Sequence, residues 1–238
     1  MAQDVRGHAM NPATLKSVAV DLLAAGAAIA YIRQCRKPAW LPGRFLVARM
    51  NWSHGGLTTW GLGHLSIRQD ATILDVGCGG GRTIERLSGL APNGKVFGVD
   101  YSAASVSASR RHNASLIAAG RVDVQEASVS SLPFPPSTFD VITAVETHYY
   151  WPNLALDVTE VLRVLKPGGA FMLLAETYKG RSFDWLYRPV MTGLLSASYL
   201  SVEEHRSLLV GAGYVGVEVS IDERRGWICA VGNKPDGA

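Results

Sequence analysis

Two carboxylates on either side of a glycine-rich segment are the residues best suited to bind a ligand. Asp75 lies in the apolar stretch 72–76, directly before the glycine-rich segment 77–81, and Asp100 ends a second apolar stretch at 95–100. Glycines in such a loop permit positive backbone φ angles and the close approach of a ligand. A carboxylate beside the loop attracts a cation and repels a pyrophosphate, and a carboxylate about 20 residues further on is placed to accept hydrogen bonds from a ribose. The two acids therefore predict a ligand that carries both a positive charge and a ribose.

The spacing of the glycines separates two candidate cofactors. The G-x-G-x-x-G pattern of dinucleotide binding needs a glycine at position 82, where this chain has Arg82. A sulfonium together with a ribose matches the two carboxylates, so S-adenosyl-L-methionine is the predicted cofactor. The three cysteines at 35, 78 and 229 show neither metal-ligand spacing nor a disulfide framework. No metal is therefore expected, and a reducing cytoplasm is the predicted location.

These carboxylates need a sheet that brings the ends of its strands together. Apolar stretches alternate with segments of helical periodicity, which is typical of a parallel sheet covered by helices on both faces. The pattern predicts strands at 72–76, 95–99, 121–125, 139–144, 169–174, 214–221 and 226–232. It predicts helices at 83–90, 102–119, 154–165, 183–196 and 201–212. The turn-rich segment 222–225 between the last two strands predicts a hairpin.

Several motifs give the chain a family resemblance from about residue 51 to residue 235. The segments 75–81 and 98–100 resemble the first two motifs of the class I S-adenosylmethionine-dependent methyltransferases, and further matches follow in order at 132–135, 139–142 and 161–169. The resemblance implies an α/β fold with a Rossmann-like, doubly wound, seven-stranded sheet, a C-terminal antiparallel hairpin and an N-terminal helical extension. It divides the chain into an N-terminal extension or lid, residues 1–64, and a methyltransferase domain, residues 65–238.

The resemblance places the methionine part of the cofactor along the glycine-rich loop. Gly77, Cys78 and Gly79 are expected to run beside it. Asp75 is expected near the cofactor's amino group or as a residue that organises the loop.

The ribose and adenine are assigned to the following strand ends. The resemblance implies that Asp100 accepts hydrogen bonds from the ribose hydroxyls and that Tyr101 packs on the adenine. Many relatives hold the adenine amino group with an Asp at the position of Ser128, so Ser128 and the Val129 backbone are expected to make a weaker contact. Val145, at the end of the fourth strand, is expected to face the transferred methyl group.

The segment after the fourth predicted strand offers the candidates for catalysis. It lacks the Asn or Asp followed by Pro-Pro that enzymes methylating exocyclic amines carry, which argues against a nucleobase acceptor. His148 has an intrinsic pKa suited to a general base, Glu146 is expected to orient it or to contact the acceptor, and Tyr149 is the third candidate. Alternatively, His148 only shapes an aromatic pocket for a small, partly apolar acceptor. The remaining candidates for the pocket wall and lid are Asn51, His54, Trp60, Tyr150, Trp151 and Tyr178.

An apolar helix is predicted near the N-terminus, at 14–34. Its core from 18 to 32 is uncharged apart from Asp21, and it is shorter than the ~20 apolar residues of a membrane-spanning helix. A helix packed on the domain or on a second subunit is the expectation. Contact with a membrane surface is the alternative, because Arg33, Arg36 and Lys37 follow the apolar core.

Length and charge limit the function classes. The chain has 238 residues, of which 47% are hydrophobic and 18% charged, with a net charge of +3 and no Lys/Arg run. We therefore expect no nucleic-acid partner. The sequence predicts a cytoplasmic methyltransferase that transfers a methyl group to an O, N or S nucleophile of a small molecule by in-line displacement. The alternative is a regulatory module that binds S-adenosylmethionine without turnover, and the sequence gives no oligomeric state.

Overall fold

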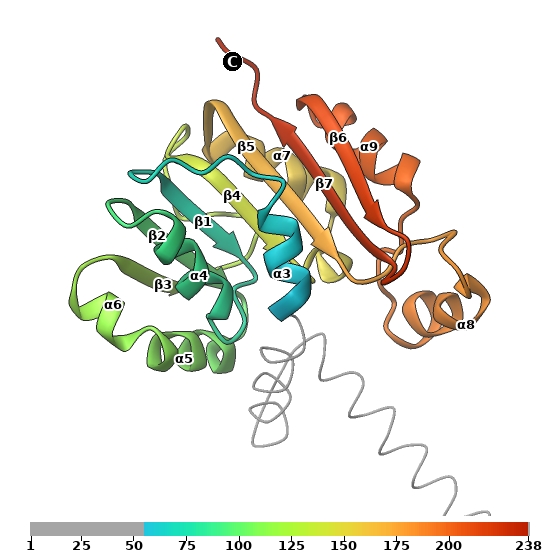
Figure 1. The fold of residues 1–238 in the computed structure, drawn as a ribbon, viewed down its shortest axis with the longest axis horizontal. Coiled ribbons are helices and arrows are strands. Elements are labelled where there is room, and N and C mark those ends of the chain that lie inside the picture. The colour runs from blue at the N-terminus through green and yellow to red at the C-terminus, as the bar shows by residue number, and fades with distance from the viewer. Residues whose placement is uncertain (1–54, 238) are drawn as a thin grey trace, which may run out of the picture.

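A single twisted sheet forms the centre of the protein, with helices on both of its faces (Figure 1). The computed structural model describes residues 55–237 of the chain. The predicted helix at 14–34 and the candidate lid residues Asn51 and His54 lie outside the described residues. The division predicted between residues 64 and 65 stays a prediction.

Seven strands form the sheet in the order β3-β2-β1-β4-β5-β7-β6. They are β1 (Thr72–Val76), β2 (Lys95–Asp100), β3 (Val122–Glu126), β4 (Phe139–Val145), β5 (Leu165–Ala175), β6 (Val215–Asp222) and β7 (Trp227–Asn233). The first five strands run parallel, and β7 pairs antiparallel with both β5 and β6. The predicted α/β fold class, with its C-terminal antiparallel hairpin, is therefore confirmed.

One strand begins earlier than the sequence pattern predicts. Strand β5 starts at Leu165, which pairs with Phe139, whereas the prediction began at residue 169. The register then shifts between residues 139 and 141 of β4. Gly168 has a positive φ of 70°, so the Pro-Gly-Gly segment is an irregularity within the strand.

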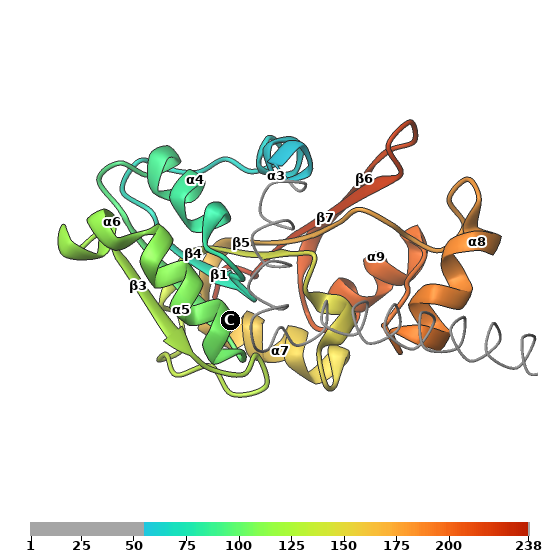
Figure 2. The ribbon, with the colours of Figure 1, turned by 90° about the horizontal axis from the view of Figure 1, so that it is seen from below.

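The helices divide between the two faces of the sheet (Figure 2). They are α3 (Gly55–Leu62), α4 (Arg82–Leu90), α5 (Ala103–His112), α6 (Ala114–Ala118), α7 (Leu154–Val164), α8 (Asp184–Arg188) and α9 (Val202–Gly211), with a 3₁₀ turn η1 (His148–Tyr150) and a π-helical turn η2 (Pro189–Leu194). Residues of α3, α4 and α5 join one hydrophobic cluster, and residues of α7 and α9 join the other. No helix within 55–237 is long and apolar enough to cross a bilayer.

Two predicted helices are broken in the structure. The helix predicted at 102–119 divides at Asn113, whose side-chain Nδ2 donates to the carbonyl oxygens of Gly81 and Ser109, each at 3.0 Å. This buried amide ties the end of α5 to the glycine-rich loop. The helix predicted at 183–196 is the short α8 followed by a π-helical turn that begins at Pro189, which lacks the N–H that a continuous α-helix needs.

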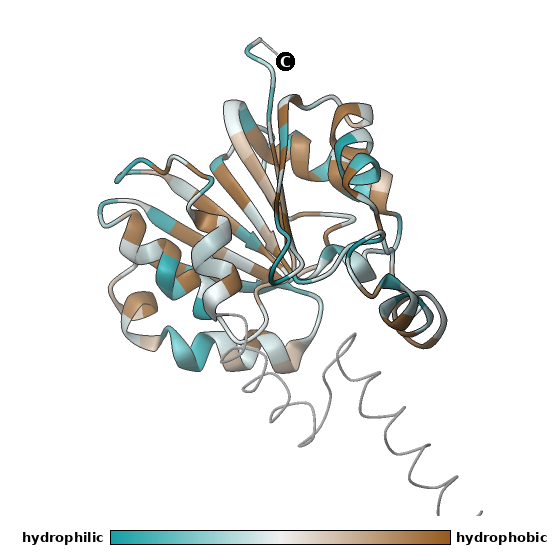
Figure 3. Ribbon diagram, turned by 45° about the vertical axis from the view of Figure 1, so that its right-hand side comes forward, coloured by the Kyte–Doolittle hydropathy of each residue, from teal (hydrophilic) through white to brown (hydrophobic). Residues whose placement is uncertain are grey.

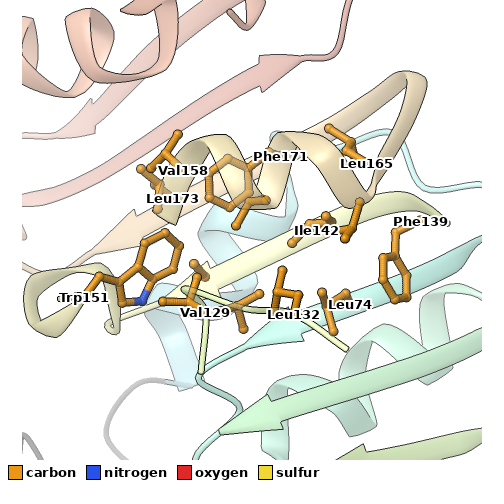
Figure 4. Packing of buried hydrophobic residues seen from close by; sticks show 14 of the residues in the cluster. Leu74, Val129, Leu132, Phe139, Ile142, Trp151, Val158, Leu165, Phe171 and Leu173 are labelled. Atoms are coloured by element: carbon orange, nitrogen blue, oxygen red, sulfur yellow. The ribbon is translucent and has the colours of Figure 1, made fainter. Parts of the chain in front are cut away.

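The central strands are buried on both faces, which explains their nearly continuous apolar sequences (Figure 3). Successive residues of a strand point to opposite faces. Ile73 of β1 accordingly belongs to the cluster beneath α3 and α4, and Leu74 belongs to the cluster beneath α7 and α9. In the second cluster Leu74 lies with Ile142 and Phe171 (Figure 4). The two layers fix the strand ends where the functional residues stand.

Candidate active site

A cavity of about 410 Å³ opens at the carboxyl ends of β1, β2 and β4, a volume typical of small-molecule sites. Among the residues of its wall are Gly77, Cys78, Gly79, Asp100, Tyr101, Ser128, Val129, Val145, Glu146, Tyr150 and Trp151. All of these were candidates from the sequence. Their segments are far apart in the chain and meet here because parallel strands end at the same edge of the sheet.

The glycine-rich loop is fastened to the neighbouring strand. The backbone N–H groups of Gly77 and Cys78 both donate to the carbonyl oxygen of Val99 in β2, at 2.8 and 3.0 Å. Gly77 has a φ of 75°, and a Cβ there would overlap the Thr147 side chain. Gly79 has a φ of 50°, and a Cβ there would meet only open space. The loop therefore needs Gly77 for packing, while Gly79 leaves room on the cavity side.

Asp100 stands at the end of β2 with its carboxylate in the cavity wall. Its two oxygens accept from the N–H groups of Gly79, at 3.0 Å, and Ser102, at 2.9 Å. Burial raises the pKa of Asp100, and these hydrogen bonds oppose the rise. A carboxylate has about four acceptor positions, so capacity remains for a ribose hydroxyl.

Asp75 is turned away from the cavity wall. It is buried in the sheet, where its Oδ1 accepts from the Thr143 hydroxyl of β4 at 2.7 Å. Burial raises the pKa of Asp75 to about 7, and the hydrogen bond from Thr143 opposes this rise. Of the two roles that the resemblance implied, the position beneath the loop fits an organising residue that joins β1 to β4.

Ser128 and Val129 follow the end of β3 in the chain and border the cavity. The Ser128 hydroxyl accepts from the backbone N–H of Ser130 at 3.2 Å. The Ala127 N–H donates to the carbonyl oxygen of Asp100 at 3.1 Å. The segment predicted for adenine is thus attached to the segment predicted for the ribose.

Glu146 stands at the end of β4 with a positive φ of 61°, a conformation that non-glycine residues rarely adopt. Its Oε1 accepts from the backbone N–H of Glu176, which follows β5, and lies 3.4 Å from the Tyr149 hydroxyl. Burial and the charge of Glu176 raise the pKa of Glu146 well above its usual value. A strained backbone holds this carboxyl group in the cavity wall, where a proton acceptor with a raised pKa is useful.

His148 does not reach the cavity. It is fully buried, and neither ring nitrogen has a hydrogen-bond partner among the described residues. Its ring centroid lies 4.5 Å from that of Tyr149 and 5.4 Å from that of His205 in α9. Burial holds the pKa of His148 well below its usual value. Glu146 contacts Glu176 and Tyr149 rather than His148, so of its two expected roles the contact with the acceptor stays a prediction.

Three other aromatic candidates do not line the cavity, and of these Tyr149 and Tyr178 are buried while Trp60 is partly buried. Trp60 packs against Trp227, with ring centroids 5.9 Å apart. Tyr149 and Tyr178 are buried in a third cluster, which includes Met191 of η2. By contrast, Trp151 both packs in the core and borders the cavity. Its ring stacks on that of Phe171, with centroids 6.4 Å apart (Figure 4).

Sequence reasoning missed the arginines of the cavity wall. Arg82 and Arg86 lie four residues apart in α4 and so share one face of that helix. Arg86 donates to the carbonyl oxygen of Gly55 and to the Thr59 hydroxyl, the latter at 2.8 Å. It thereby holds α3 against the edge of the cavity. The spacing of the two arginines was the signal that could have revealed them.

The strand order and the loop after β1 define a Rossmann-like α/β domain of the methyltransferase type. The methyltransferase-domain family matches residues 73–169. A solved S-adenosylmethionine-dependent methyltransferase from Aquifex aeolicus aligns with a TM-score of 0.64 and 19% identity, over 79% of this chain and 97% of that one. At that identity the likeness concerns the fold.

Sequence relatives identify the family. The ubiquinone/menaquinone biosynthesis C-methyltransferase UbiE of Geobacter sulfurreducens is 30% identical over 192 residues, which cover 72% of this chain and 69% of the relative. A demethylmenaquinone methyltransferase of Symbiobacterium thermophilum is 38% identical over 103 residues, which cover 43% of this chain and 41% of the relative. The match thus spans about two fifths of the second relative's length. The chain belongs to the class I S-adenosylmethionine-dependent methyltransferases.

Proposed function

We propose that the chain transfers a methyl group from S-adenosylmethionine to a small acceptor with a hydroxylated aromatic ring. The cofactor supplies a methyl group on a positively charged sulfur. The acceptor supplies the electron pair for the new bond, and its hydroxyl proton passes to Glu146. Loss of that proton raises the electron density on both the oxygen and the adjacent ring carbons. Methylation at oxygen is then complete, whereas methylation at carbon also requires the ring proton to leave the methylated carbon and a proton to return to the oxygen.

The cavity fits the cofactor on three observations. Gly79 leaves open space beside the loop, Asp100 retains acceptor capacity, and the volume is that of a small-molecule site. We assign the methionine part to the loop at 77–79 and the ribose to Asp100. We assign the adenine to the wall that Tyr101, Ser128 and Val129 form.

The observation that carries the choice of acceptor is the Glu146 carboxyl group. A hydroxyl acceptor needs a base, and a base works best when its pKa lies near the operating pH. Burial and the neighbouring Glu176 raise the pKa of Glu146 in that direction. Val145, Tyr150 and Trp151 border the cavity around it and supply an apolar wall for a flat ring. The names of both relatives refer to quinones, which supports an acceptor with a ring.

His148 has no proton-transfer role in this assignment. Its unpartnered nitrogens are buried beside His205 rather than facing the cavity. We assign it instead to the support of η1, the turn that carries Tyr150 to the cavity wall.

The test is methyl transfer by Glu146→Gln, with Glu203→Gln on the surface of α9 as the matched control. Glutamine keeps the shape of Glu146 but cannot accept the proton, so kcat should fall by about 10²-fold or more, while cofactor affinity stays unchanged. Glu203 is exposed and does not border the cavity, so the control should keep full kcat. Full turnover by Glu146→Gln would refute the assignment of the base. Cofactor binding by the unmodified chain without turnover on any acceptor would favour the regulatory module.

A further inference from the structure

We propose that the segment around α8 docks on the surface of an anionic lipid bilayer. Four large apolar side chains within eight residues are exposed there: Phe183 by 69%, Trp185 by 74%, Leu186 by 56% and Val190 by 40%. Single exposed apolar residues are ordinary on a protein surface, but a contiguous group of this size marks a contact site. Docking here does not depend on the identity of the methyl acceptor.

The apolar side chains are held outward by a polar anchor on the inner side of the helix. Asp184 has a side chain that is only 15% exposed. Its Oδ1 accepts from the Tyr199 hydroxyl at 2.8 Å, and its Oδ2 accepts from Arg188 Nη2 at 2.7 Å. The helix thus places its acid against the body of the protein and its aromatic and aliphatic residues toward the solvent. This arrangement is the reverse of an ordinary surface helix.

The backbone conformation supports a fixed presentation of this surface. Phe183 has a positive φ of 62°, which is a strained conformation for an aromatic residue. The backbone N–H of Leu186 donates to the Phe183 carbonyl oxygen at 2.9 Å, and Met191 is buried in the cluster below. The exposed residues are therefore displayed on an anchored turn.

The charges around the apolar tip favour anionic lipid. The segments 179–190 and 222–225 contain five basic and three acidic residues. Lys179, Arg188 and Arg225 pair with Glu204, Asp184 and Asp222, so the net charge is +1 when Glu204 is included. The two segments are joined, because Arg181 Nη2 donates to the carbonyl oxygen of Arg225 at 3.4 Å. The guanidinium carbon of Arg181 also lies over the Tyr187 ring, 4.5 Å from its centroid. Tryptophan and other apolar residues with arginine and lysine beside them are the composition of surfaces that bind the bilayer interface.

The shape of the segment favours a bilayer over a protein partner. In Figures 1 and 2 α8 projects at the margin of the molecule, beyond the end of the sheet. A stable protein interface takes about 20–30 residues from each side, whereas this tip offers four strongly exposed apolar residues. A small projecting tip can insert into a fluid interface without a complementary surface.

The segment also lies near the cavity along the chain. Glu176, which donates its N–H to Glu146 in the cavity wall, precedes Phe183 by only seven residues. Docking through α8 would hold the carboxyl edge of the sheet close to the bilayer.

The experiment is sedimentation of the full-length chain with two kinds of vesicle. One kind is phosphatidylcholine alone, and the other contains about 30% phosphatidylglycerol, which makes its surface anionic. We expect binding to the anionic vesicles that weakens as salt is added. Trp185→Glu/Leu186→Glu should lower this binding at least tenfold. The matched control is Leu156→Glu on α7, which replaces another apolar residue with 66% exposure and should bind as the unmodified chain does. If the double variant does not fold, the milder change Trp185→Ser tests the same contact and should also lower binding.

Several results would overturn membrane docking through α8. One is the absence of the unmodified chain from the pellet with anionic vesicles, and another is equal binding to neutral vesicles. Unchanged binding by both α8 variants would place the lipid contact elsewhere in the chain. A dimer in analytical ultracentrifugation that Trp185→Glu/Leu186→Glu dissociates would instead show a contact between copies of this chain.

Discussion

The backbone N–H of Glu176 donates to the carboxylate of Glu146, and this hydrogen bond joins the ends of β4 and β5 at the cavity wall. The two acidic side chains consequently lie close enough that the charge of Glu176 raises the pKa of Glu146. The hydrogen bond itself opposes that rise. Burial is the larger cause of the raised pKa, so the carboxyl group is both positioned and weakened as an acid by its surroundings.

The pH dependence of turnover should follow the ionisation of Glu146. A base acts only when deprotonated, so kcat should increase as the pH rises through the raised pKa of Glu146. Glu176→Gln removes the neighbouring charge and should move this rise to lower pH, because less repulsion opposes the ionisation. Measurement of kcat against pH for both proteins checks the shift. Profiles that superimpose would show that Glu176 does not influence the base.

Replacement of Asp100 should weaken cofactor binding. Asp100→Asn removes a charged acceptor, and the loss is expected to be about 1.5–3 kcal/mol in binding free energy. Isothermal titration calorimetry with S-adenosylhomocysteine measures it. Glu126→Gln is the matched control, because Glu126 is the exposed neighbour of Asp100 across the β2-β3 pair. If the two variants bind equally well, the ribose contact lies elsewhere.

The two glycines of the loop should differ when each is replaced by alanine. Both substitutions introduce a Cβ at positive φ, which costs about 1–3 kcal/mol. Gly77→Ala should lower the free energy of unfolding further, because its Cβ would overlap Thr147, whereas Gly79→Ala meets open space. Urea denaturation of the cofactor-free proteins compares them. Equal destabilisation would contradict the packing of Thr147 against the loop.

The buried Asp75 should make stability fall as the pH rises. Its pKa of about 7 in the folded chain lies above the ordinary value of 3.8, so the folded state holds the proton more tightly than the unfolded state. The stabilisation is complete below about pH 4 and is lost by about pH 7, with a total of about 4 kcal/mol. Asp75→Asn cannot ionise and should lack this component.

Denaturation of the cofactor-free proteins at several pH values between about 4 and 8 measures that component as the difference between the two chains. The difference removes the contributions of titrating groups that do not interact with Asp75. A difference that does not change with pH would mean that Asp75 keeps an ordinary pKa in the folded protein.

The sheet and the cofactor side of the cavity could be predicted from sequence because each depends on local patterns. Buried parallel strands require continuous apolar runs, and the glycines with Asp75 and Asp100 mark the strand ends directly. Parallel topology then brings separate segments to one edge. The residues predicted along the loop and at Asp100 accordingly line the cavity.

The acceptor side was harder because it depends on single turns. His148 follows β4 in a 3₁₀ turn that directs His148 and Tyr149 inward and Tyr150 to the cavity. No periodicity in the sequence distinguishes these three positions. The break at Asn113 depends on a long-range hydrogen bond to Gly81, and the inward direction of Asp75 depends on Thr143 from another strand. Such tertiary contacts leave no local pattern.

The most direct test of the central claim is release of S-adenosylhomocysteine from the full-length chain with a panel of phenols, hydroquinones, thiols, amines and carboxylates. We expect turnover with hydroxylated aromatic rings. Turnover by Glu146→Gln should be slower by about 10²-fold or more, which is the typical contribution of a general base. A no-acceptor control defines the background. Turnover confined to amines or thiols, or turnover on phenols that Glu146→Gln leaves unchanged, would contradict the proposed acceptor and its base.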